Sequence, residues 1–364
     1  MSSPFPPTAS APGKGIIDLA LLPPCTPVLR SVSYQYPLKL ISPTPITVDP
    51  SHAKKHTGKA LNDTSALSSA DHGAHLVHTV FLLTYGGGLV AGDSIFLTVT
   101  LAPTTRLVLL TQGSTKIFKS PSSDVVTRQT MGVDVDPGAA LVYLPDPVQP
   151  FERSAFEQKQ IYNILLAEPS PGETVGRKGS LCVLDWVSCG RRALGEDWDF
   201  YRYGSRNEIY LVKDVQKRLL LRDNILLDTY GEDIGTLAPR MDGLQVFGTL
   251  ILYGPLFTKL AAFFMDEFKA LPRIGGRNWD TNSEAGSGDE PDEEEVRIEV
   301  WRRGRQRREV VDGLLWTAAS VRGCVVVKFG AREVEGGRTW LRSMLDAEGS
   351  VVGLFGERAL LCLN

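Results

Sequence analysis

The side chains best placed for chemistry in this sequence are four carboxylates that stand at turns or inside apolar runs: Asp93, Asp146, Asp185 and Glu196. Spaced carboxylates with few histidines nearby suit a hard or borderline cation that is held loosely together with water. The alternative is that each carboxylate forms a structural ion pair. Asp185 lies within the apolar run 181–186, where a charge is costly unless it is paired or hydrogen-bonded. We expect Arg191 or Lys116 to supply that partner.

A glycine-rich turn precedes Asp93, and its glycines are Gly86, Gly87, Gly88 and Gly92. The run before it, 76–83, is apolar or β-branched, and the run after it, 94–101, alternates with period two. This pattern predicts a strand, a turn and a strand, with the glycines at positions of positive φ or of close backbone approach. A phosphate-binding loop needs a helix N-terminus behind it, whereas a strand follows here. We therefore predict a structural turn that leaves Asp93 exposed at its end.

The five histidines fall in or beside one polar segment, at His52, His56, His72, His75 and His78. On a helix, His72, His75 and His78 would share one side, and neutral imidazoles suit nickel, copper or zinc. However, Gly73 and the serine-rich surroundings argue against a helix, and His78 begins a predicted strand. The spacing leaves metal binding by this cluster open.

The rest of the sequence carries no recognisable catalytic motif. It has no Gly-x-Ser-x-Gly elbow, no P-loop, no His-Glu-x-x-His motif and no cysteine with a plausible histidine partner. The chain has 364 residues, of which 43% are hydrophobic, and a net charge of −3, which are ordinary values for a globular protein. No uniformly basic field points to nucleic acid, and no apolar stretch is as long as a membrane span. We predict a protein that is not an enzyme.

Five cysteines are scattered along the chain without a Cys-x-x-Cys pair: Cys25, Cys182, Cys189, Cys324 and Cys362. This usage predicts reduced, mostly buried thiols in a cytoplasmic protein rather than a disulfide framework or a zinc site. The segment 1–12 is rich in Pro, Ser and Ala and lacks the apolar centre of a signal peptide, so we expect a disordered tail.

Short β-branched or alternating runs recur about every ten residues. They predict strands at 95–101, 106–111, 125–131, 139–144, 180–188, 207–212, 219–221 and 246–253. The run 151–167 is either one long strand or two strands joined by a bulge. Strands this closely spaced, with little helix between them, indicate a mainly β fold of stacked or wrapped sheets. Two helices, at 255–271 and 339–347, are expected to pack on those sheets.

Two segments, 51–74 and 274–295, are too polar to offset the entropy of ordering them. We expect both to be disordered inserts in a single domain that spans 13–364. A basic stretch, 302–308, follows the second insert. We expect a solvated hairpin whose charge is answered by the acidic run 289–295. A nucleic-acid patch is the weaker alternative, because no aromatic residues interleave with the arginines.

Several short motifs follow one another along the chain: Gly86–Asp93, Thr111-Gln112-x-x-Thr115-Lys116, Pro145–Phe151 and Gly190-Arg191-x-x-x-Gly195-Glu196, with Pro37-Leu38-Lys39 and Lys328-Phe329-Gly330 near the ends. Their order resembles that of the urease accessory protein D family, called UreD, or UreH in some bacteria. Together they run from about residue 13 to residue 330. The sequence departs from the family pattern at Gln149-Pro150 and at Gly113-Ser114. The two inserts are similar to those of eukaryotic members, in particular fungal ones.

The resemblance implies a scaffold with a β-helix-like stack of sheets and two helices. Its expected partners are urease apoprotein, accessory protein F and, through F, the GTPase accessory protein G, with neither nucleic acid nor membrane involved. It implies transient passage of Ni²⁺ to the urease active site, with no tightly bound cofactor. Carried over by motif, Asp93 and Glu196 are the leading candidates to line a nickel passage. The other polar motif residues are Thr111, Gln112, Lys116, Asp146, Asp185 and Arg191.

Two other functions stay open on the sequence. The first is a β-helix enzyme for carbohydrates or small molecules, with Asp93, Asp185 and Glu196 as acid and base. It would need a cleft that places two carboxyls close together, with one pKa raised. The second is a β-rich interaction module in which the carboxylates are structural. If partners bury part of this protein, a large exposed apolar surface is also expected.

Overall fold

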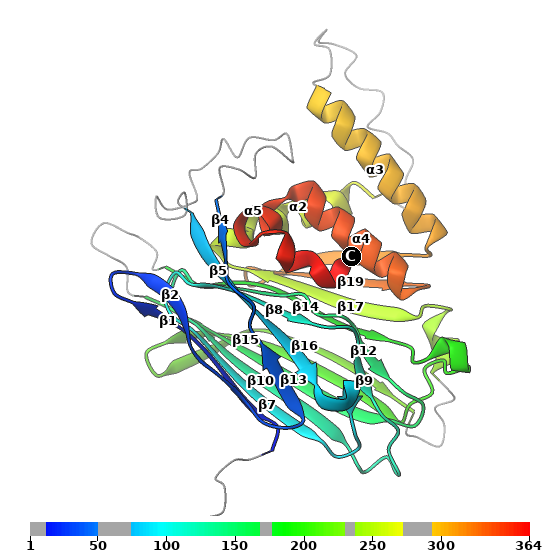
Figure 1. Ribbon diagram of the computed structural model, residues 1–364. Coiled ribbons are helices and arrows are strands. Elements are labelled where there is room, and N and C mark those ends of the chain that lie inside the picture. Colours follow the sequence, from blue (N-terminus) through cyan, green and yellow to red (C-terminus); the bar gives the residue numbers. More distant parts are fainter. Residues whose placement is uncertain (1–11, 50–73, 168–176, 230–236, 272–292) are drawn as a thin grey trace, which may run out of the picture.

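Strands are the commonest elements of the described chain and form two sheets that face each other, with helices on the outer side of one sheet (Figure 1). The computed structural model describes residues 12–49, 74–167, 177–229, 237–271 and 293–364. The expected tail at 1–12 and the inserts at 51–74 and 274–295 therefore lie almost wholly outside the described residues. Residues 293–295 are an exception, because they begin a helix instead of ending a disordered loop.

Sheet A is the seven-stranded sheet, and it forms the lower layer in Figure 1. In order, its strands are β16 (Gln216–Asp228), β15 (Arg202–Lys213), β13 (Ala155–Leu165), β10 (Thr127–Val135), β7 (Ser94–Leu101), β1 (Lys14–Leu22) and β2 (Thr26–Tyr34). Strands β15 to β1 pair in parallel, whereas β16 and β2 pair antiparallel at the two edges.

Sheet B is twelve-stranded and lies between sheet A and the helices. Its main path is β18 (Leu315–Val321), β19 (Cys324–Ala331), β17 (Val246–Tyr253), β14 (Ser180–Ser188), β11 (Ala140–Tyr143), β8 (Arg106–Thr111), β5 (His75–Thr84) and β3 (Leu38–Ile41). The short strands off this path are β4 (Ile46–Val48), β6 (Gly88–Leu89), β9 (Thr115–Ile117) and β12 (Val148–Pro150).

The middle of the chain winds from one sheet to the other. It passes from β7 in sheet A to β8 in sheet B, and then through β10, β11, β13, β14 and β15, so each turn adds a parallel strand to each sheet. This winding is β-helix-like, and the predicted mainly β class is confirmed. Antiparallel strands at both ends of the path terminate the stack.

The burial pattern follows from the layers. β7 alternates between buried and outward positions, as expected for a strand with one face on the core. β8 and β14 are buried at every position, because sheet A covers one face and helices cover the other. Along β14, Leu181, Val183 and Val187 belong to the core between the sheets, whereas Leu184 and Trp186 belong to the core beneath the helices.

The predicted strands at 106–111, 180–188 and 246–253 coincide with β8, β14 and β17. The run 151–167 contains one long strand, β13, preceded by the short β12. The strand predicted at 219–221 extends over all of β16, since β15 pairs with it along its length. Four of the five cysteines are buried and Cys25 is exposed, and all five are free thiols. Within the described residues, no helix combines the length and the hydropathy needed to cross a membrane.

More helix is present than the two segments that the sequence predicts. The described α-helices are α2 (Thr258–Lys269), α3 (Glu293–Val311), α4 (Val334–Glu348) and α5 (Ser350–Phe355), and the 3₁₀ helix η6 (Glu357–Leu363) follows them. Helix α2 lies within the segment predicted at 255–271, and α4 extends the one predicted at 339–347 toward its N-terminus. Helices α3 and α5 were not predicted.

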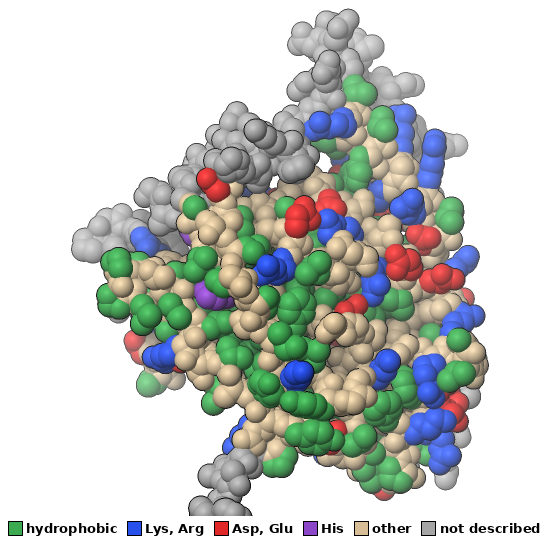
Figure 2. Space-filling view, in the orientation of Figure 1, with side chains coloured by type: hydrophobic (Ala, Val, Ile, Leu, Met, Phe, Trp, Pro, Cys, Tyr) green, Lys and Arg blue, Asp and Glu red, His purple; other side chains and the backbone are tan. Residues whose placement is uncertain are grey.

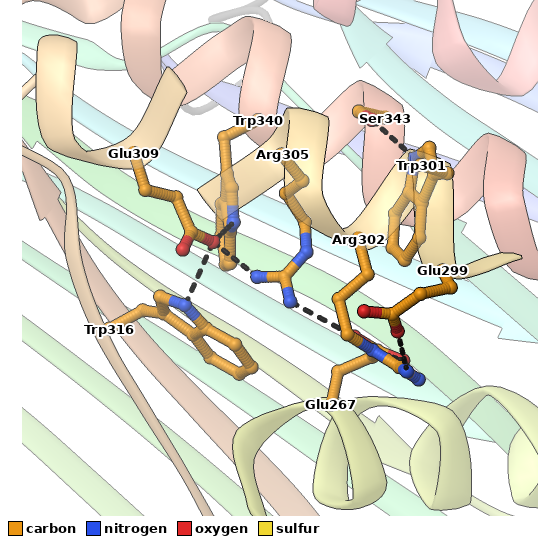
Figure 3. Close-up of polar contacts among 9 residues, drawn as sticks. All are labelled: Glu267, Glu299, Trp301, Arg302, Arg305, Glu309, Trp316, Trp340 and Ser343. Carbon is orange, nitrogen blue, oxygen red and sulfur yellow. Dashed lines mark hydrogen bonds and ion pairs between the residues drawn. The ribbon is translucent and has the colours of Figure 1, made fainter. Parts of the chain in front are cut away.

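The expectation of a solvated basic hairpin at 302–308 is wrong, because this stretch belongs to α3. Arg302 and Arg305 on the inner face of α3 pair with Glu267 of α2, at 2.6 Å and 2.9 Å (Figure 3). Arg305 also pairs with Glu309, whose Oε1 accepts hydrogen bonds from the Trp316 and Trp340 side chains. The charges of Arg302 and Arg305 are thus neutralised by carboxylates of α2 and α3 in a largely buried network.

Candidate functional site

The glycine-rich turn takes the form that its sequence predicts. Gly86, Gly87 and Gly92 have φ of 73°, 76° and 85°, which favour glycine. Gly88 has an extended backbone, but a Cβ there would lie 2.7 Å from the backbone oxygen of Lys116. Asp93 is half-buried rather than exposed, and its Oδ2 accepts a hydrogen bond of 2.9 Å from the backbone N–H of Val90. Its carboxylate therefore closes the turn.

The other motif segments assemble beside this turn as a set of short paired strands. Gly88 of β6 pairs with Lys116 of β9, and Lys116 pairs with Gln149 of β12. The neighbouring Val148 pairs with Val187 of β14. We call this set, β6, β9, β12 and the end of β14, the motif platform. Segments that are up to a hundred residues apart in sequence are thus brought side by side at the end of β14, a central strand of sheet B.

Asp146 is the polar centre of the loop that precedes β12. Its carboxylate accepts hydrogen bonds from the Thr111 hydroxyl at 3.2 Å, the Gly113 backbone N–H at 2.9 Å and Arg338 of α4 at 2.8 Å. The Thr111 hydroxyl in turn accepts from the Asp146 backbone N–H at 2.8 Å. Gln112 and Lys116 are exposed and lie outside this cluster. Asp146 is therefore engaged in holding the loop.

Glu196 is 5% exposed and pairs with Arg191, whose guanidinium stacks 3.8 Å from the centre of the Phe151 ring. Burial acts to raise the pKa of Glu196. Hydrogen bonds from the side chain and backbone of Arg191, and from the backbone of Glu152, outweigh it and hold the pKa below its ordinary value. Glu196 is thus an ionised carboxylate with its charge already neutralised.

Asp185 is different, because it is 2% exposed and its partners are uncharged. Gln158 and Asn207 each donate an amide hydrogen bond of 2.6 Å to its carboxylate. The Ser205 hydroxyl donates a further hydrogen bond, and the Tyr203 hydroxyl lies at 3.5 Å. All four donors come from β13 and β15 of sheet A, whereas Asp185 lies on β14 of sheet B. The carboxylate therefore joins the two sheets across the core.

The expectation that Arg191 or Lys116 would pair with Asp185 is wrong. Arg191 is committed to Glu196, and Lys116 is exposed on the motif platform. Asp185 points between the sheets, since it shares the face of β14 that carries Val183 and Val187. Neither basic side chain lies on that face, so the neutral donors of sheet A take their place.

Burial raises the pKa of Asp185 above its ordinary value, and the nearby carboxylate of Asp223 raises it further. The hydrogen bonds from Ser205, Asn207 and Gln158 act in the opposite direction. Burial likewise raises the pKa of Tyr203, with the Asp185 charge adding to the effect. Among the described side chains, no positively charged group bonds to Asp185. The core therefore holds a carboxylate that is hydrogen-bonded but not ion-paired.

A polar row continues from Asp185 toward the open edge of the sandwich. In sheet B, Asp185 is the register partner of Thr249, and Thr249 is the partner of Lys328. In sheet A, Asn207 is the partner of Asp223. Sequence reasoning missed this row, although polar residues at inward positions of β13, such as Gln158 and Gln160, and of β15, such as Asn207, were a signal for it.

The histidine cluster does not form on a helix. His75 and His78 lie on β5, where a spacing of three places side chains on opposite faces of the strand. His78 is 5% exposed, with Nε2 3.1 Å from the carbonyl of Pro27, and burial lowers its pKa despite this hydrogen bond. His72 and Gly73 lie outside the described residues. The described part of the chain holds no group of three or more His, Cys, Asp or Glu side chains arranged for a metal.

The carboxylates proposed for acid–base chemistry are not brought together. Asp93 closes a turn, Glu196 pairs with Arg191, and Asp185 bonds to sheet A, so each of the three carboxylates has its own separate partners. Two adjoining surface pockets, of about 540 and 410 Å³, share Arg332 and Glu333 in their walls, and the three carboxylates line neither of them.

Comparison with known proteins bears on the whole chain. A protein-family model described as "UreD urease accessory protein" matches residues 26–354. The chain is 29% identical over 351 residues to urease accessory protein 4 of Cryptococcus neoformans var. grubii. This match covers 88% of this chain and 86% of that protein. It is 28% identical over 270 residues to the uncharacterized urease accessory protein ureD-like of Schizosaccharomyces pombe, covering 73% and 80%. Urease accessory protein D of Arabidopsis thaliana is 35% identical over 175 residues, covering 48% and 54%.

Proposed function

Because this chain belongs to the UreD family of urease accessory proteins, we propose that it is a scaffold for urease maturation that has no turnover of its own. It binds urease apoprotein and accessory protein F, which brings the GTPase accessory protein G. The assembly helps to pass Ni²⁺ to the urease active site. Nickel is the cargo in this proposal and not a resident cofactor. The free thiols of the chain support action in the cytoplasm.

The observation that carries the nickel part of the proposal is the environment of Asp185. It is a buried carboxylate between the two sheets whose hydrogen-bond donors among the described residues are all neutral. A passing divalent cation could bind this carboxylate without first breaking an ion pair. Oxygen donors spaced along a route hold a cation loosely, which suits transfer better than storage.

The contacts rank Asp185 above Glu196 and Asp146 as a nickel ligand. Glu196 and Asp146 would have to give up Arg191 and Arg338 respectively, whereas Asp185 would exchange hydrogen bonds from neutral donors for the ion. Asp93 closes the glycine-rich turn through the hydrogen bond from the Val90 backbone N–H. In this proposal, these three carboxylates hold the motif platform in shape, and Asp185 contacts the ion.

The partner part of the proposal is supported by exposed apolar side chains near the glycine-rich turn. Tyr36 and Tyr85 are 62% and 44% exposed, and their ring centres lie 5.9 Å apart. Phe96 and Ile16, on the outer face of sheet A, are both 48% exposed. Figure 2 shows hydrophobic side chains gathered over the lower half of that view, away from the helices. Exposed apolar patches of this kind are typical of surfaces that partners cover.

The test is complementation in a urease-positive host from which the gene for this protein has been deleted. Urease activity and urease-bound nickel are measured after return of the intact gene, of Asp185→Asn or of the Asp93→Ala/Glu196→Ala pair. Glu208→Gln is the matched control, because Glu208 is a buried carboxylate on β15 that is neutralised by Lys159 and Arg222. The abundance of each variant is measured in the same cells.

The expected result is apo-urease without activity in the deletion strain, restored by the intact chain and by Glu208→Gln. Asp185→Asn should give less nickel per urease at unchanged abundance of the accessory protein. Full activity and nickel content in the deletion strain would overturn the maturation role. Full nickel loading with Asp185→Asn would overturn the assignment of Asp185 alone.

A further inference from the structure

Lys328 lies at the outer end of the polar row, where its ammonium pairs with a carboxylate. Its Nζ lies 2.6 Å from Oδ1 of Asp223 and 3.4 Å from the hydroxyl of Thr249. The Lys328 side chain is 45% exposed, whereas Asp223 is 11% exposed. The ammonium thus sits at the mouth of the row, between solvent and the interior carboxylates.

The strand registers place this ion pair on the route to Asp185. Lys328, Thr249 and Asp185 follow one another across β19, β17 and β14, all on the face toward sheet A. Asp223 lies directly across from Asn207, and side chains directly opposite in an antiparallel pair share a face. Asn207 then donates to Asp185. The row therefore runs from the solvent to the buried carboxylate without a gap in register.

Two acceptors in this row lack a donor among the described residues. Oδ1 of Asn207, in a side chain that is 1% exposed, has no hydrogen-bond partner, and neither has Oδ2 of Asp223. Buried acceptors are normally satisfied, and an exception calls for a water molecule, a ligand or an ion. With the Asp185 carboxylate and the Thr249 hydroxyl, these atoms make an oxygen-rich lining that a cation would complete.

We propose that the Lys328 ammonium is a tethered cation which fills the outer position of this row, and that a divalent cation enters by displacing it. The inference deepens the proposed nickel transfer and rests on it. The exposed head of Lys328 can swing into solvent on its flexible stem. The incoming ion is then bound by the carboxylates of Asp223 and Asp185, by the side-chain oxygen of Asn207 and by water. This set of oxygen ligands suits loose binding.

The position of Lys328 determines when a cation can enter the polar row. With Lys328 in place, the outer carboxylate is neutralised, so ions in bulk solvent gain little by entering. A partner that drew Lys328 away, by offering a carboxylate of its own, would open the row at the moment of docking. The occupant to be tested is Ni²⁺, supplied as its chloride.

The experiment measures Ni²⁺ binding to the purified full-length protein, freed of any histidine tag, by equilibrium dialysis. Lys328→Met removes the ammonium and keeps the stem, and Lys328→Arg keeps a positive charge. The matched control is Lys159→Met, since Lys159 is 42% exposed and also pairs with a buried carboxylate, Glu208, on the outer face of sheet A. The double variant Lys328→Met/Asp223→Asn removes the outer carboxylate as well. Circular dichroism and thermal unfolding check that each variant is folded.

Lys328→Met should bind Ni²⁺ roughly tenfold more tightly than the intact protein, as expected for removal of a competing charge. Lys328→Arg and Lys159→Met should match the intact protein, and the double variant should lose the gain. Equal affinity of Lys328→Met and the intact protein would overturn the proposal, as would a gain that survives in the double variant. Because this readout is direct binding, failure here leaves the complementation result untouched.

Discussion

Arg338 on α4 donates a hydrogen bond of 2.8 Å to Oδ1 of Asp146, which lies 192 residues earlier in the chain. This contact fastens the C-terminal helices to the loop that leads into the motif platform. Cys362 of η6 adds to it from the same side, because its thiol lies 3.3 Å from the carbonyl of Thr111. The end of the chain therefore stabilises a loop from its middle.

Asp146→Ala should lower the free energy of unfolding by about 2–3 kcal/mol, because it leaves the Thr111 hydroxyl, the Gly113 N–H and Arg338 without their acceptor. Urea denaturation followed by tryptophan fluorescence measures this. Arg338→Met should cost less than Asp146→Ala, since one donor is lost rather than one acceptor of three hydrogen bonds. Equal stability of Asp146→Ala and the intact protein would show that the loop does not depend on this carboxylate.

The network in Figure 3 predicts how α3 is attached. Glu267→Gln should destabilise the protein by about 1.5–3 kcal/mol, because Arg302 and Arg305 each lose one of their two carboxylate partners and keep Glu299 and Glu309 respectively. Hydrogen exchange should show the loss of protection first in α3.

The control for this network is Arg303→Ala, which removes an exposed partner of Glu299 on the same helix. Exposed pairs contribute little to stability, so its unfolding curve should overlay that of the intact protein. Similar losses from the buried and exposed changes would contradict the assigned role of Glu267.

Two glycines should respond to alanine in opposite ways. Gly88→Ala places a Cβ 2.7 Å from the Lys116 backbone oxygen and should destabilise the protein by about 1–3 kcal/mol through displacement of β9. Gly304→Ala, in the middle of α3 with no atom within 4 Å of the new Cβ apart from the local helix backbone, should stabilise it by roughly 0.8 kcal/mol. Thermal unfolding of both variants gives the comparison. A Gly88→Ala protein as stable as the intact one would show that β6 and β9 can separate at no cost.

Glu196 predicts part of the response to acid. Since its pKa in the folded protein lies below the ordinary 4.5, its contribution to stability is complete above that value and is lost as the pH falls through the folded pKa. The stability advantage of the intact protein over Glu196→Gln should therefore shrink below about pH 4.5. Denaturant titrations from pH 7 downward measure it, and a constant difference would count against the Arg191 pair.

Asp185 should behave in the reverse sense. Its pKa is raised in the folded protein, so its contribution to stability is present below the ordinary value of 3.8 and is lost as the pH rises through the folded pKa. Relative to Asp185→Asn, the intact protein should lose stability as the pH rises. An advantage that grows with pH would mean that a positive charge compensates the carboxylate. The same denaturant titrations give this comparison.

The strands that the sequence predicted best are those buried on both faces. β8 and β14 are continuous apolar runs bounded by turn residues, and such runs are visible without tertiary information. β16 was seen over three residues only, because charged residues such as Arg218, Arg222 and Asp223 interrupt its apolar positions. Its full length depends on pairing with β15, which local pattern does not contain.

Helix α3 and the polar row were missed for a related reason. The inner face of α3 carries Arg302, Arg305 and Glu309 in place of an apolar stripe, so its helical period was hidden. In the row, Asn207 and Asp223 look like ordinary outward polar residues until strand register places them inside. The apolar run 181–186 did single out Asp185, whereas its neutral partners come from a different sheet.

The winding of the chain between the sheets affects how fast the protein folds. Each parallel strand of the stack meets its partner only after the chain has crossed to the other sheet and returned, so the central ladders contain no hairpins. Contacts of such long sequence separation require costly loop closures before they stabilise anything, and chains rich in them fold slowly. Until each coil has closed, its strand edges stay open to other chains. We therefore expect refolding from denaturant to take seconds or longer and its yield to fall as the protein concentration rises.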